Sequence, residues 1–423
     1  MPIAYYFAAA CALLAAFALR VGRLDYQSLW YDEGSSIYLA RQSLAGITRG
    51  TAADIHPPLY YYLLHFWMAA TGSGEYAVRS LSVAAGLVTV ALLFTLGQRL
   101  CGTSVGLIAA VAGAVSPLAV YFSQETRMYA QVTMLGLLST YLLLRLTDGR
   151  GSKPAAWLWL AYGAATSACL YSQYVGVLML AVQGIYVLLA RRRALLPFML
   201  SAGAAVVVFV PWLAVAKNSL LSWPSTDAFH AGPQLFIDAA FRYVFGLSAD
   251  VSALTVALTC AVCAIATLAL KPSPAAAGQG RVRVAPHQPS PAAVGEGRVR
   301  VPPARHAIWL PILYVAVPLM LMFLLGYRKP LYNPKFALLA LPGFLLLLGA
   351  GAQSLGKLKL PALAIVLASA GYALHDYYAN PAFARDDYRG LAHFIATSSR
   401  PGDAIILDAP GQEQIFPYYY TGS

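Results

Sequence analysis

The main deficit of this 423-residue sequence is charge: only 11% of its residues are Asp, Glu, Lys or Arg, whereas 59% are hydrophobic. A soluble globular protein carries about 25% charged residues, so this chain has too few to cover a water-facing surface. Its hydrophobic residues occur in runs close to the ~20 residues that a helix needs to cross a bilayer. These runs lack the strict alternation of a membrane β-strand. The sequence therefore predicts an all-α polytopic membrane protein.

Cysteine is also scarce, and no known binding motif for zinc or nucleotides is present. The five cysteines, which lie in or beside hydrophobic runs, are Cys11, Cys101, Cys169, Cys260 and Cys263. Cys260 and Cys263 have CxxC spacing, but no second pair or nearby His accompanies them. We interpret them as small residues one helical turn apart. The glycines fit neither a dinucleotide-binding nor a Walker pattern, so a nucleotide site is not predicted.

Hydrophobic windows of about 19 residues predict about eleven transmembrane helices. They lie near residues 4–19, 80–97, 104–121, 128–146, 156–170, 173–190, 195–214, 251–270, 306–326, 336–352 and 360–376. The N-terminal stretch lacks a basic leader and a small-residue cleavage site, so we expect it to remain as the first span. The net charge of +12 comes mostly from short loops between spans, and we therefore predict no nucleic-acid binding.

The loop charges also predict the orientation and the domains. With a cytoplasmic N-terminus, most basic clusters face the cytoplasm and the loop 20–79 faces outward, although Arg20 and Arg23 argue the other way. We expect residues 1–376 to form one transmembrane domain in the cytoplasmic membrane, with its functional face on the periplasmic or extracellular side. Residues 271–305 are rich in Pro, Ala and Gly and predict a disordered basic cytoplasmic insert.

The C-terminal residues 377–423 predict the start of an outer α/β domain that is cut short. Residues 386–395 have the pattern of an amphipathic helix, and residues 404–408 that of a strand after a Pro-Gly turn. The sequence ends before a second strand could pack on the first.

The adjacent carboxylates Asp32 and Glu33 lie behind Trp30 and Tyr31 at the outer edge of the first span. An acid near an apolar boundary is partly dehydrated, which raises its pKa and suits proton transfer. Acidic residues are also favoured in the first turn of any helix. From the residues alone, a catalytic pair and a structural pair both stay open.

Two further polar segments lie at the expected outer face. His56 precedes a Pro-Pro pair and an aromatic run that suits an interfacial helix, and it could be a base, a metal ligand or a turn cap. Glu125 and Arg127 form a charged island between two hydrophobic spans. Because so short a loop cannot carry charge far from the bilayer, we expect these two side chains to pair or to share a polar cavity.

A basic segment at 327–335 departs from the orientation rule because its cations Arg328, Lys329 and Lys335 fall on the outer side. Such an exception indicates an anionic partner, for which a lipid phosphate is the natural candidate. An ordinary headgroup anchor is the alternative.

These features, in this order, resemble the GT-C glycosyltransferases of the family that contains the protein O-mannosyltransferases and the aminoarabinose lipid A transferase. The resemblance covers about residues 1–350 and rests on the segments Trp30–Glu33, His56–Tyr61, Glu75–Arg79, Ser123–Ala130 and Asn333–Phe336. It implies many membrane helices, with amphipathic helices of the first outer loop lying on the outer leaflet. It also implies a polyprenyl-phosphate sugar donor and inversion at the anomeric carbon.

The resemblance further implies roles for single residues. Asp32 corresponds to the base that engages the acceptor, and Glu33 supports it. Contacts with substrate or phosphate are expected from His56, Tyr60, Glu125, Arg127, Tyr129, Arg328, Lys329 and Lys335. The resemblance implies no certain cofactor, but His56 lies near a position around which some relatives bind a metal, which admits a divalent ion. Lys335 stands where many relatives have Arg, and Lys cannot bind phosphate bidentately.

Together these observations predict an inverting glycosyltransferase. Its partners would be membrane lipids, a polyprenyl-phosphate-linked sugar and an outer-face acceptor such as a glycolipid, a cell-surface glycan or a protein. A lipid-linked-sugar flippase or transporter is one alternative, but it would place ionisable residues inside the spans rather than at their outer edge. A non-catalytic scaffold with the same fold is the other, and the presence of both Asp32 and Glu33 argues against it.

Overall fold

The computed structural model describes residues 3–147, 156–222, 232–270, 307–327, 332–400, 402–409 and 411–420, and this part of the chain is helical without a β-strand. By length and composition, eight of its helices could cross a membrane, or nine if the bent pair α6–α7 counts as one span. The prediction of an all-α polytopic membrane protein is confirmed. The count of eleven spans is not, since the windows 156–170 and 173–190 form helices of only 17 residues or fewer.

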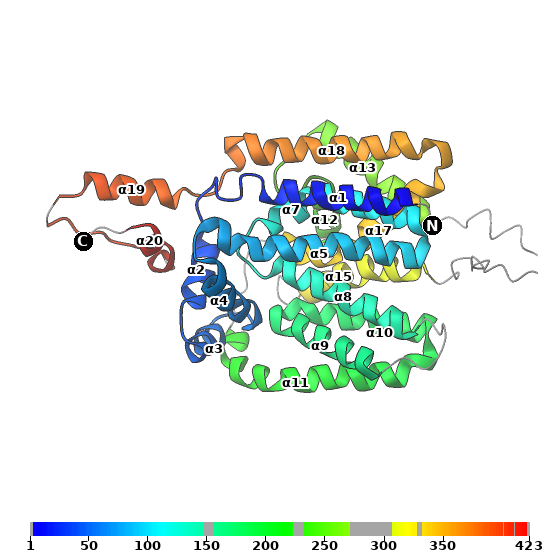
Figure 1. Cartoon of the computed structure of the whole chain (residues 1–423), viewed down its shortest axis with the longest axis horizontal. Helices are drawn as coiled ribbons and strands as arrows, with labels where there is room; N and C mark the ends of the chain where they lie inside the picture. Colours follow the sequence, from blue (N-terminus) through cyan, green and yellow to red (C-terminus); the bar gives the residue numbers. More distant parts are fainter. Residues whose placement is uncertain are drawn as a thin grey trace, which may run out of the picture.

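Most of the bundle helices run side by side along the long axis of the molecule (Figure 1). They are α1 (Ile3–Val21), α5 (Glu75–Cys101), α6 (Thr103–Val115), α7 (Pro117–Ser123), α8 (Tyr129–Thr147), α9 (Ala156–Ser172), α10 (Val177–Ala190), α11 (Leu195–Ser222), α12 (Gln234–Phe245), α13 (Ala253–Thr267), α15 (Trp309–Gly326), α17 (Leu341–Ser354) and α18 (Lys359–Ala379). In a bilayer only a helix can satisfy the backbone of one segment internally, so long apolar runs fold this way.

Small residues pack the centre of the bundle: 83% of the apolar window in the segment Pro334–Ser354, which includes α17, is buried, against 22% in α1. A Cβ added to Gly97 of α5 would lie 2.6 Å from the Gly106 Cα of α6. A Cβ on Gly351 of α17 would overlap the Ile265 carbonyl of α13. These helices approach each other closely because glycine leaves their backbones bare.

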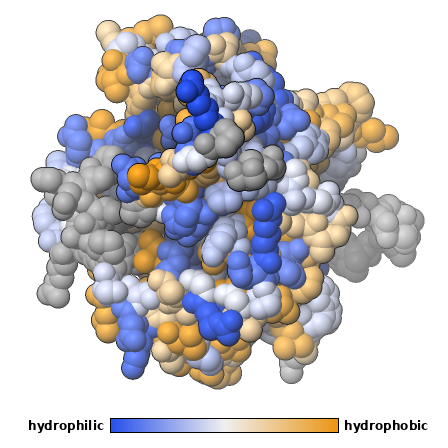
Figure 2. Space-filling model, turned by 90° about the vertical axis from the view of Figure 1, so that its left-hand side faces the viewer, coloured by the Kyte–Doolittle hydropathy of each residue, from blue (hydrophilic) through white to orange (hydrophobic). Residues whose placement is uncertain are grey.

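Three short helices lie at one end of the bundle: α2 (Tyr31–Ala40), α3 (Leu44–Ala53) and α4 (Leu59–Thr71). Ser43 caps α3, and Pro58 fixes the start of α4, which ends at Gly72 with φ +90°. We call this end of the molecule the α2–α4 end. Seen from this side, hydrophilic side chains gather across the middle of the face (Figure 2).

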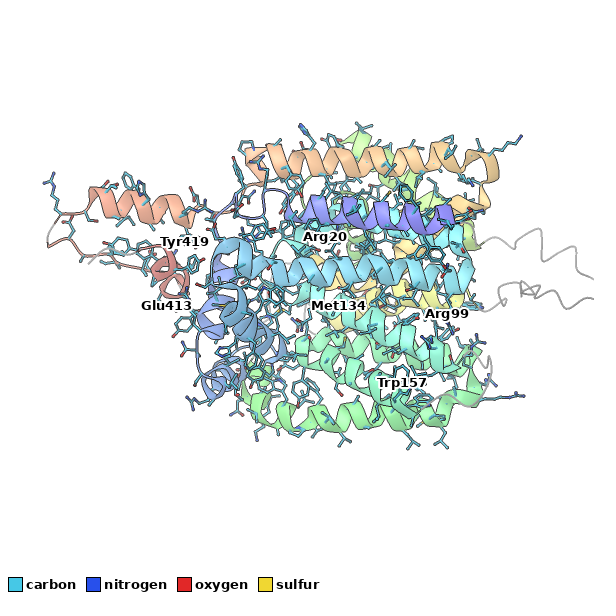
Figure 3. All side chains as sticks on the ribbon, in the orientation of Figure 1. Arg20, Arg99, Met134, Trp157, Glu413 and Tyr419 are labelled. Carbon is cyan, nitrogen blue, oxygen red and sulfur yellow. The ribbon has the colours of Figure 1, made fainter. Side chains whose placement is uncertain are left out.

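Arg20 of α1 is a buried structural residue, although its sequence position suggested an exception to the orientation rule. The span α6–α7 bends by 58° at Ser116–Pro117, where proline cannot donate to the carbonyl of Gly113. Arg20, labelled on α1 in Figure 3, donates instead to the carbonyls of Gly113 and Ala114, at 3.1 and 2.9 Å, and to the Ser123 hydroxyl. The carbonyls at the break in the span thus accept hydrogen bonds from a side chain of a neighbouring helix.

The C-terminal segment differs in part from the expected α/β start. The predicted helix forms as α19 (Tyr388–Ser398), but residues 403–408 form no strand. A strand needs a partner for its backbone groups, and the described part of the chain supplies none there. The chain instead returns to the bundle through α20 (Gln412–Tyr419), where buried Ile415 lies directly against Gly34 of α2. The expected insert 271–305 lies outside the described residues.

We expect Arg20→Met to lower the unfolding temperature of the detergent-purified protein, because the carbonyls of Gly113 and Ala114 lose their donor inside the bundle. Each unsatisfied buried polar group costs about 1–3 kcal/mol. The matched control is Arg193→Met, which removes an exposed arginine near the start of α11. Equal unfolding temperatures for the two variants would contradict the structural role of Arg20.

Candidate active site

The structure separates the two acids that are adjacent in the sequence. Both lie in the first turn of α2, where a helix N-terminus favours negative charge. The Glu33 side chain is fully buried, whereas the Asp32 side chain is 20% exposed. The pair therefore divides into one acid that is closed off and one that can be reached from the α2–α4 end.

Glu33 accepts five hydrogen bonds. Arg79 of α5 donates from Nε to Oε1 at 2.8 Å and from Nη2 to Oε2 at 2.6 Å. Arg385, which follows α18, donates from Nη1 to Oε2 at 2.9 Å. The backbone N–H groups of Thr126 and Trp30 complete the set at 2.9 and 3.3 Å. Glu33 thereby joins α2 to α5, to the loop between α7 and α8, and to the C-terminal segment.

Two guanidinium groups determine the ionisation of Glu33. Burial by itself would raise the pKa of this carboxyl, but Arg79 and Arg385 outweigh it and lower the pKa to about 2. Glu33 is therefore a carboxylate at any physiological pH. All of its bonds come from cations or backbone donors, so it is not free to take a proton from a substrate.

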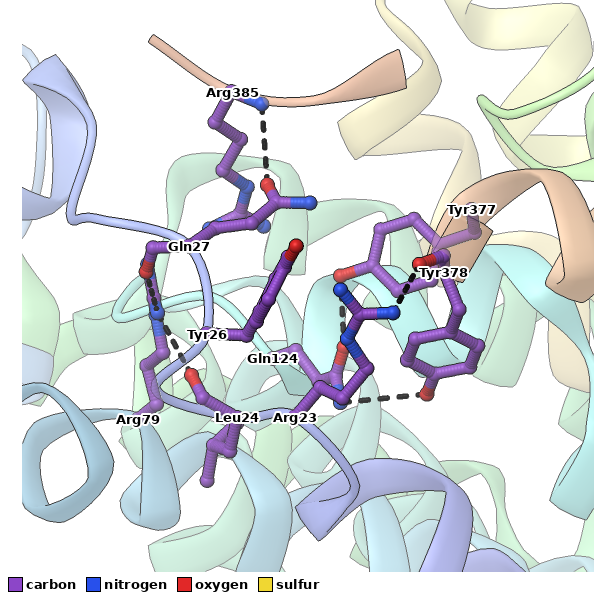
Figure 4. A pocket seen from close by; sticks show the side chains of 9 residues that line it. All are labelled: Arg23, Leu24, Tyr26, Gln27, Arg79, Gln124, Tyr377, Tyr378 and Arg385. Atoms are coloured by element: carbon purple, nitrogen blue, oxygen red, sulfur yellow. Dashed lines mark hydrogen bonds between the residues drawn. The ribbon is translucent and has the colours of Figure 1, made fainter. Parts of the chain in front are cut away.

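Arg79 also holds the segment that leads into α2. Its Nη1 donates to the carbonyls of Leu24 and Gln27, each at 2.8 Å, and its Nη2 to the Ser28 carbonyl at 2.9 Å. Figure 4 shows this arginine beside Leu24 and Gln27, on the wall of a small pocket. One side chain at the start of α5 thus fixes both Glu33 and the backbone before α2.

Asp32 lies in a chain of polar side chains that the sequence leaves far apart. Arg127 has its Nε 3.8 Å from Asp32 Oδ2 and donates to the Asp32 carbonyl at 3.2 Å. The other end of the guanidinium lies 3.2 Å from His56 Nε2. His56 Nδ1 in turn lies 3.0 Å from Asp54 Oδ2.

The charged neighbours of His56, Arg127 and Asp54, fix the tautomer of its ring. Burial lowers the pKa of His56, and the Arg127 cation adds to this, although the hydrogen bond with Asp54 opposes it. The neutral ring then donates from Nδ1 to Asp54 and accepts from Arg127 at Nε2. Burial also disfavours the charge of Arg127, but Tyr61, Tyr129 and Asp32 outweigh it, so its pKa lies above the ordinary value. Arg127 is a permanent, buried cation beside Asp32.

Glu125 does not form an ion pair with Arg127 in the structure, and the two side chains serve different neighbours. Burial raises the pKa of Glu125 to about 7, against the opposing charge of Arg385. Its Oε2 is buried without a hydrogen bond in the described part of the chain. Arg127 turns to Asp32 and His56, whereas Glu125 lies on the side of Glu33 and Arg385.

Aromatic residues surround Arg127. The Tyr60 hydroxyl lies 3.3 Å from Ser82, whose hydroxyl donates to the Arg127 carbonyl, so Tyr60 supports the loop from behind. The hydroxyl of Tyr61 is buried without a partner among the described residues. The ring of Tyr129 lies 5.9 Å from the Arg127 guanidinium and 5.5 Å from Lys335 Nζ.

Of the three predicted cations of the segment 327–335, the structure describes only Lys335. Lys335 approaches the site through Tyr129, and Asn333 caps the short helix α16 (Pro334–Ala337) that carries it. Arg328 and Lys329 lie outside the described residues. Phosphate binding by these cations stays a prediction.

The residues around His56 do not fit a metal site. In the described ranges, no three His, Cys, Asp or Glu side chains come together as metal ligands. The lone pair of His56 Nε2 faces Arg127, and a cation in that position repels a metal ion. The divalent ion that the resemblance admitted therefore has no ligand set at His56.

Sequence reasoning gave no role to Arg79 and Arg385, which hold Glu33. Arg79 stood within a matching segment, and an arginine one turn inside a hydrophobic helix is a signal for a buried partner. Arg385 stands 352 residues from Glu33 in a polar stretch and carried no such signal. Only the folded chain brings it to α2.

The low pKa of Glu33 predicts that the folded protein loses stability at acid pH. Since the folded pKa of about 2 lies below the ordinary 4.5, the ionised form stabilises the fold. This contribution is complete above about pH 4.5 and is lost as the pH falls toward 2. Unfolding temperatures of the wild type should fall across that interval by an amount that Glu33→Gln lacks. Asp25→Asn, at an exposed carboxyl of the same loop, is the control and should follow the wild type.

Comparison with known proteins agrees with the sequence motifs. Residues 55–215 match the family described as dolichyl-phosphate-mannose-protein mannosyltransferase. The fold is similar to the crystal structure of ArnT from Cupriavidus metallidurans bound to undecaprenyl phosphate, with a TM-score of 0.62 and 14% identity over 99% of this chain and 84% of that chain. No match is found among curated protein sequences.

Archaeal oligosaccharyltransferases are similar as well. The apo enzyme from Archaeoglobus fulgidus matches with a TM-score of 0.53 and 13% identity, over 94% of this chain and 58% of that chain. AglB from the same organism, in complex with an inhibitory peptide and a dolichol-phosphate, matches with a TM-score of 0.51 and 11% identity over the same shares. The helical architecture, the family match and these structures confirm the resemblance: this chain is a multi-pass membrane protein with the fold of the GT-C glycosyltransferases.

Proposed function

We propose that this protein is an inverting glycosyltransferase that moves a sugar from a polyprenyl-phosphate-linked donor to an acceptor at the outer face of the cytoplasmic membrane. The observation that carries the proposal is the unequal placement of the acid pair. Asp32 is partly exposed and 3.8 Å from a buried arginine, whereas Glu33 is closed off by five donors. One acid can meet a substrate, and its neighbour holds it in place.

Asp32 is the general base of the proposed reaction. An acceptor oxygen or nitrogen attacks the anomeric carbon from the face opposite the donor phosphate, and Asp32 takes the proton of that atom. The bond between the anomeric carbon and the phosphate oxygen breaks, and polyprenyl phosphate leaves with the electron pair. A base placed this way is worth about 10²–10⁴-fold in rate.

Two cations are placed for the charge that develops on the leaving phosphate. Arg127 is buried beside Asp32, and Lys335 shares the ring of Tyr129 with it. The unpartnered Tyr61 hydroxyl can add a hydrogen-bond donor. Fixed donors in a site with little water stabilise a phosphate leaving group more strongly than water does.

We assign the polyprenyl chain of the donor to an apolar cavity of the bundle. A cavity of about 240 Å³ lies between α12, α13, α15 and α17 and has an almost wholly apolar lining, which includes Phe236, Tyr243, Cys263, Val315, Leu319 and Phe344. At its edge, the Tyr243 hydroxyl donates to the carbonyl of Ala337, which ends the short helix of Lys335. Burial of part of an isoprenoid chain there is favourable at about 25 cal/mol per Å².

The similar structures support a lipid-phosphate donor. The ArnT crystal structure has undecaprenyl phosphate bound, the AglB structure is a complex with a dolichol-phosphate, and the family match is to enzymes named for dolichyl-phosphate mannose. The polar α2–α4 end would face the periplasm or the exterior, where such donors meet a glycolipid, a glycan or a protein. A transporter would direct ionisable residues inside its spans at a substrate, whereas Arg20 and Arg79 donate to neighbouring backbone carbonyls, which supports a structural role for both.

Asp32→Asn should reduce kcat by about 10²–10⁴-fold with a polyprenyl-phosphate sugar, because the general base is lost. The KM for the donor should change little, since the cations remain. Expression and unfolding temperature should match those of the wild type, and Asp25→Asn should keep full activity. Undiminished transfer by the Asp32 variant would exclude its role as the base.

Charge reversal tests the phosphate contacts. Lys335→Glu, and separately Arg328→Glu, should raise the KM for the donor about tenfold or more, since a charge-assisted hydrogen bond contributes about 1.5–3 kcal/mol. The KM for the acceptor should stay within about twofold of the wild type. Lys359→Glu, at an exposed lysine of the opposite bundle end, is the control. An equal loss for donor and acceptor would indicate misfolding rather than lost donor binding.

A further inference from the structure

We infer that Arg385 is a positioning residue of this transferase: through Glu33 it orients α2, so that Asp32 faces the acceptor. The inference rests on the proposed function of Asp32 as the base. It assigns a role in the reaction to the segment after the last span, which lies 352 residues away from the acid pair in the sequence.

The segment of Arg385 is bonded to the residues before α2 at several points. The Arg385 N–H donates to Gln27 Oε1 at 3.1 Å. The Ser28 hydroxyl donates to the Asp386 carbonyl at 2.8 Å and accepts from the Tyr388 N–H at 3.1 Å. These bonds bring the guanidinium of Arg385 to Glu33 Oε2 and to the ring of Tyr121, whose centroid lies 5.0 Å away. These backbone contacts therefore hold the Arg385 side chain in position beside Glu33.

Arg385 contributes something that Arg79 does not. Both Arg79 contacts with Glu33 come from one side, and the rest of that guanidinium holds the carbonyls of residues 24–28. Arg385 binds Oε2 of Glu33 from the C-terminal segment, and only 7% of its side chain is exposed. Its Nε and Nη2 are buried without hydrogen bonds in the described part of the chain. Among the described residues, the one polar contact of its guanidinium is thus with Glu33, which points to orientation of that carboxylate as its role.

The position of Asp32 depends on the contact between Arg385 and Glu33 because Asp32 and Glu33 are adjacent residues. α2 has only ten residues, and Glu33 is buried in its first turn beside Asp32. A carboxylate held from two sides by guanidinium groups fixes the rotation of this turn, whereas one held from a single side leaves it freer. A displacement of about 1 Å in a reacting group can cost about 10²-fold in rate.

A pocket beside Arg385 makes chemical rescue possible. Arg23, Tyr26, Gln27 and Arg385 are among its walls (Figure 4), and Tyr26 at its rim is 63% exposed. A guanidinium ion from solution can therefore reach the space that Arg385→Gly leaves. The matched control is Arg389→Gly, which removes an arginine of the same segment that pairs with Glu75 and is 46% exposed.

The experiment measures transfer by the full-length wild type, Arg385→Gly, Arg385→Lys and Arg389→Gly. We expect kcat of Arg385→Gly to fall about 10- to 100-fold with donor KM within about twofold, since alignment and not binding is lost. Added guanidinium ion at non-denaturing concentration should restore part of kcat in Arg385→Gly only, and Arg385→Lys should retain an intermediate kcat. Unchanged kcat in Arg385→Gly, or the same loss in Arg389→Gly, would overturn the inference.

Amide hydrogen exchange of α2 separates this inference from the proposed function. Arg385→Gly should exchange faster over Tyr31–Ala40 than the wild type, and guanidinium ion should reverse the change, whether or not transfer is measured. Faster exchange over the whole bundle, or no rescue, would mean that Arg385 is merely structural. If the wild type transfers no sugar but the exchange pattern holds, the proposed function fails and the positioning of α2 by Arg385 stands.

Discussion

The site depends on one carboxylate, that of Glu33, which is closed off from solvent. Glu33 is fully buried, and an unpaired buried charge would cost several kcal/mol. Arg79 and Arg385 offset that cost, and the N–H groups of Thr126 and Trp30 satisfy the remaining acceptor capacity. Because Arg79, Thr126 and Arg385 come from distant parts of the chain, this one carboxylate ties α2 to three other segments.

This arrangement explains how two neighbouring acids differ. Glu33 accepts hydrogen bonds from protein groups and stays ionised, whereas Asp32 lies beside one buried cation, Arg127, and is partly exposed. The neutral ring of His56 then holds Arg127 in turn, with Asp54 behind it. Charge of both signs is thus distributed around one accessible carboxylate.

Arg20 and the break in α6–α7 show at a second place that a buried polar group needs a partner from the protein. A helix interrupted by Pro117 leaves a carbonyl without a donor, and the bilayer supplies none. Arg20 closes that gap from α1, and the Gln124 side chain donates to the carbonyls of Leu19, Arg20 and Gly22 at the end of the same helix. The loop that carries Arg127 is therefore anchored directly to the first span.

Composition and local pattern determined by themselves that this chain crosses a membrane as helices, because hydrophobic runs and backbone satisfaction are local properties. They also located Asp32, His56 and Arg127 near one face. Tertiary structure alone decided that Asp32 and not Glu33 is accessible, that Arg127 contacts Asp32 rather than Glu125, and that Arg385 reaches α2. It also replaced the expected strand near residue 405 with a return through α20. The free energy of a buried charge depends on partners hundreds of residues away, and no local pattern records them.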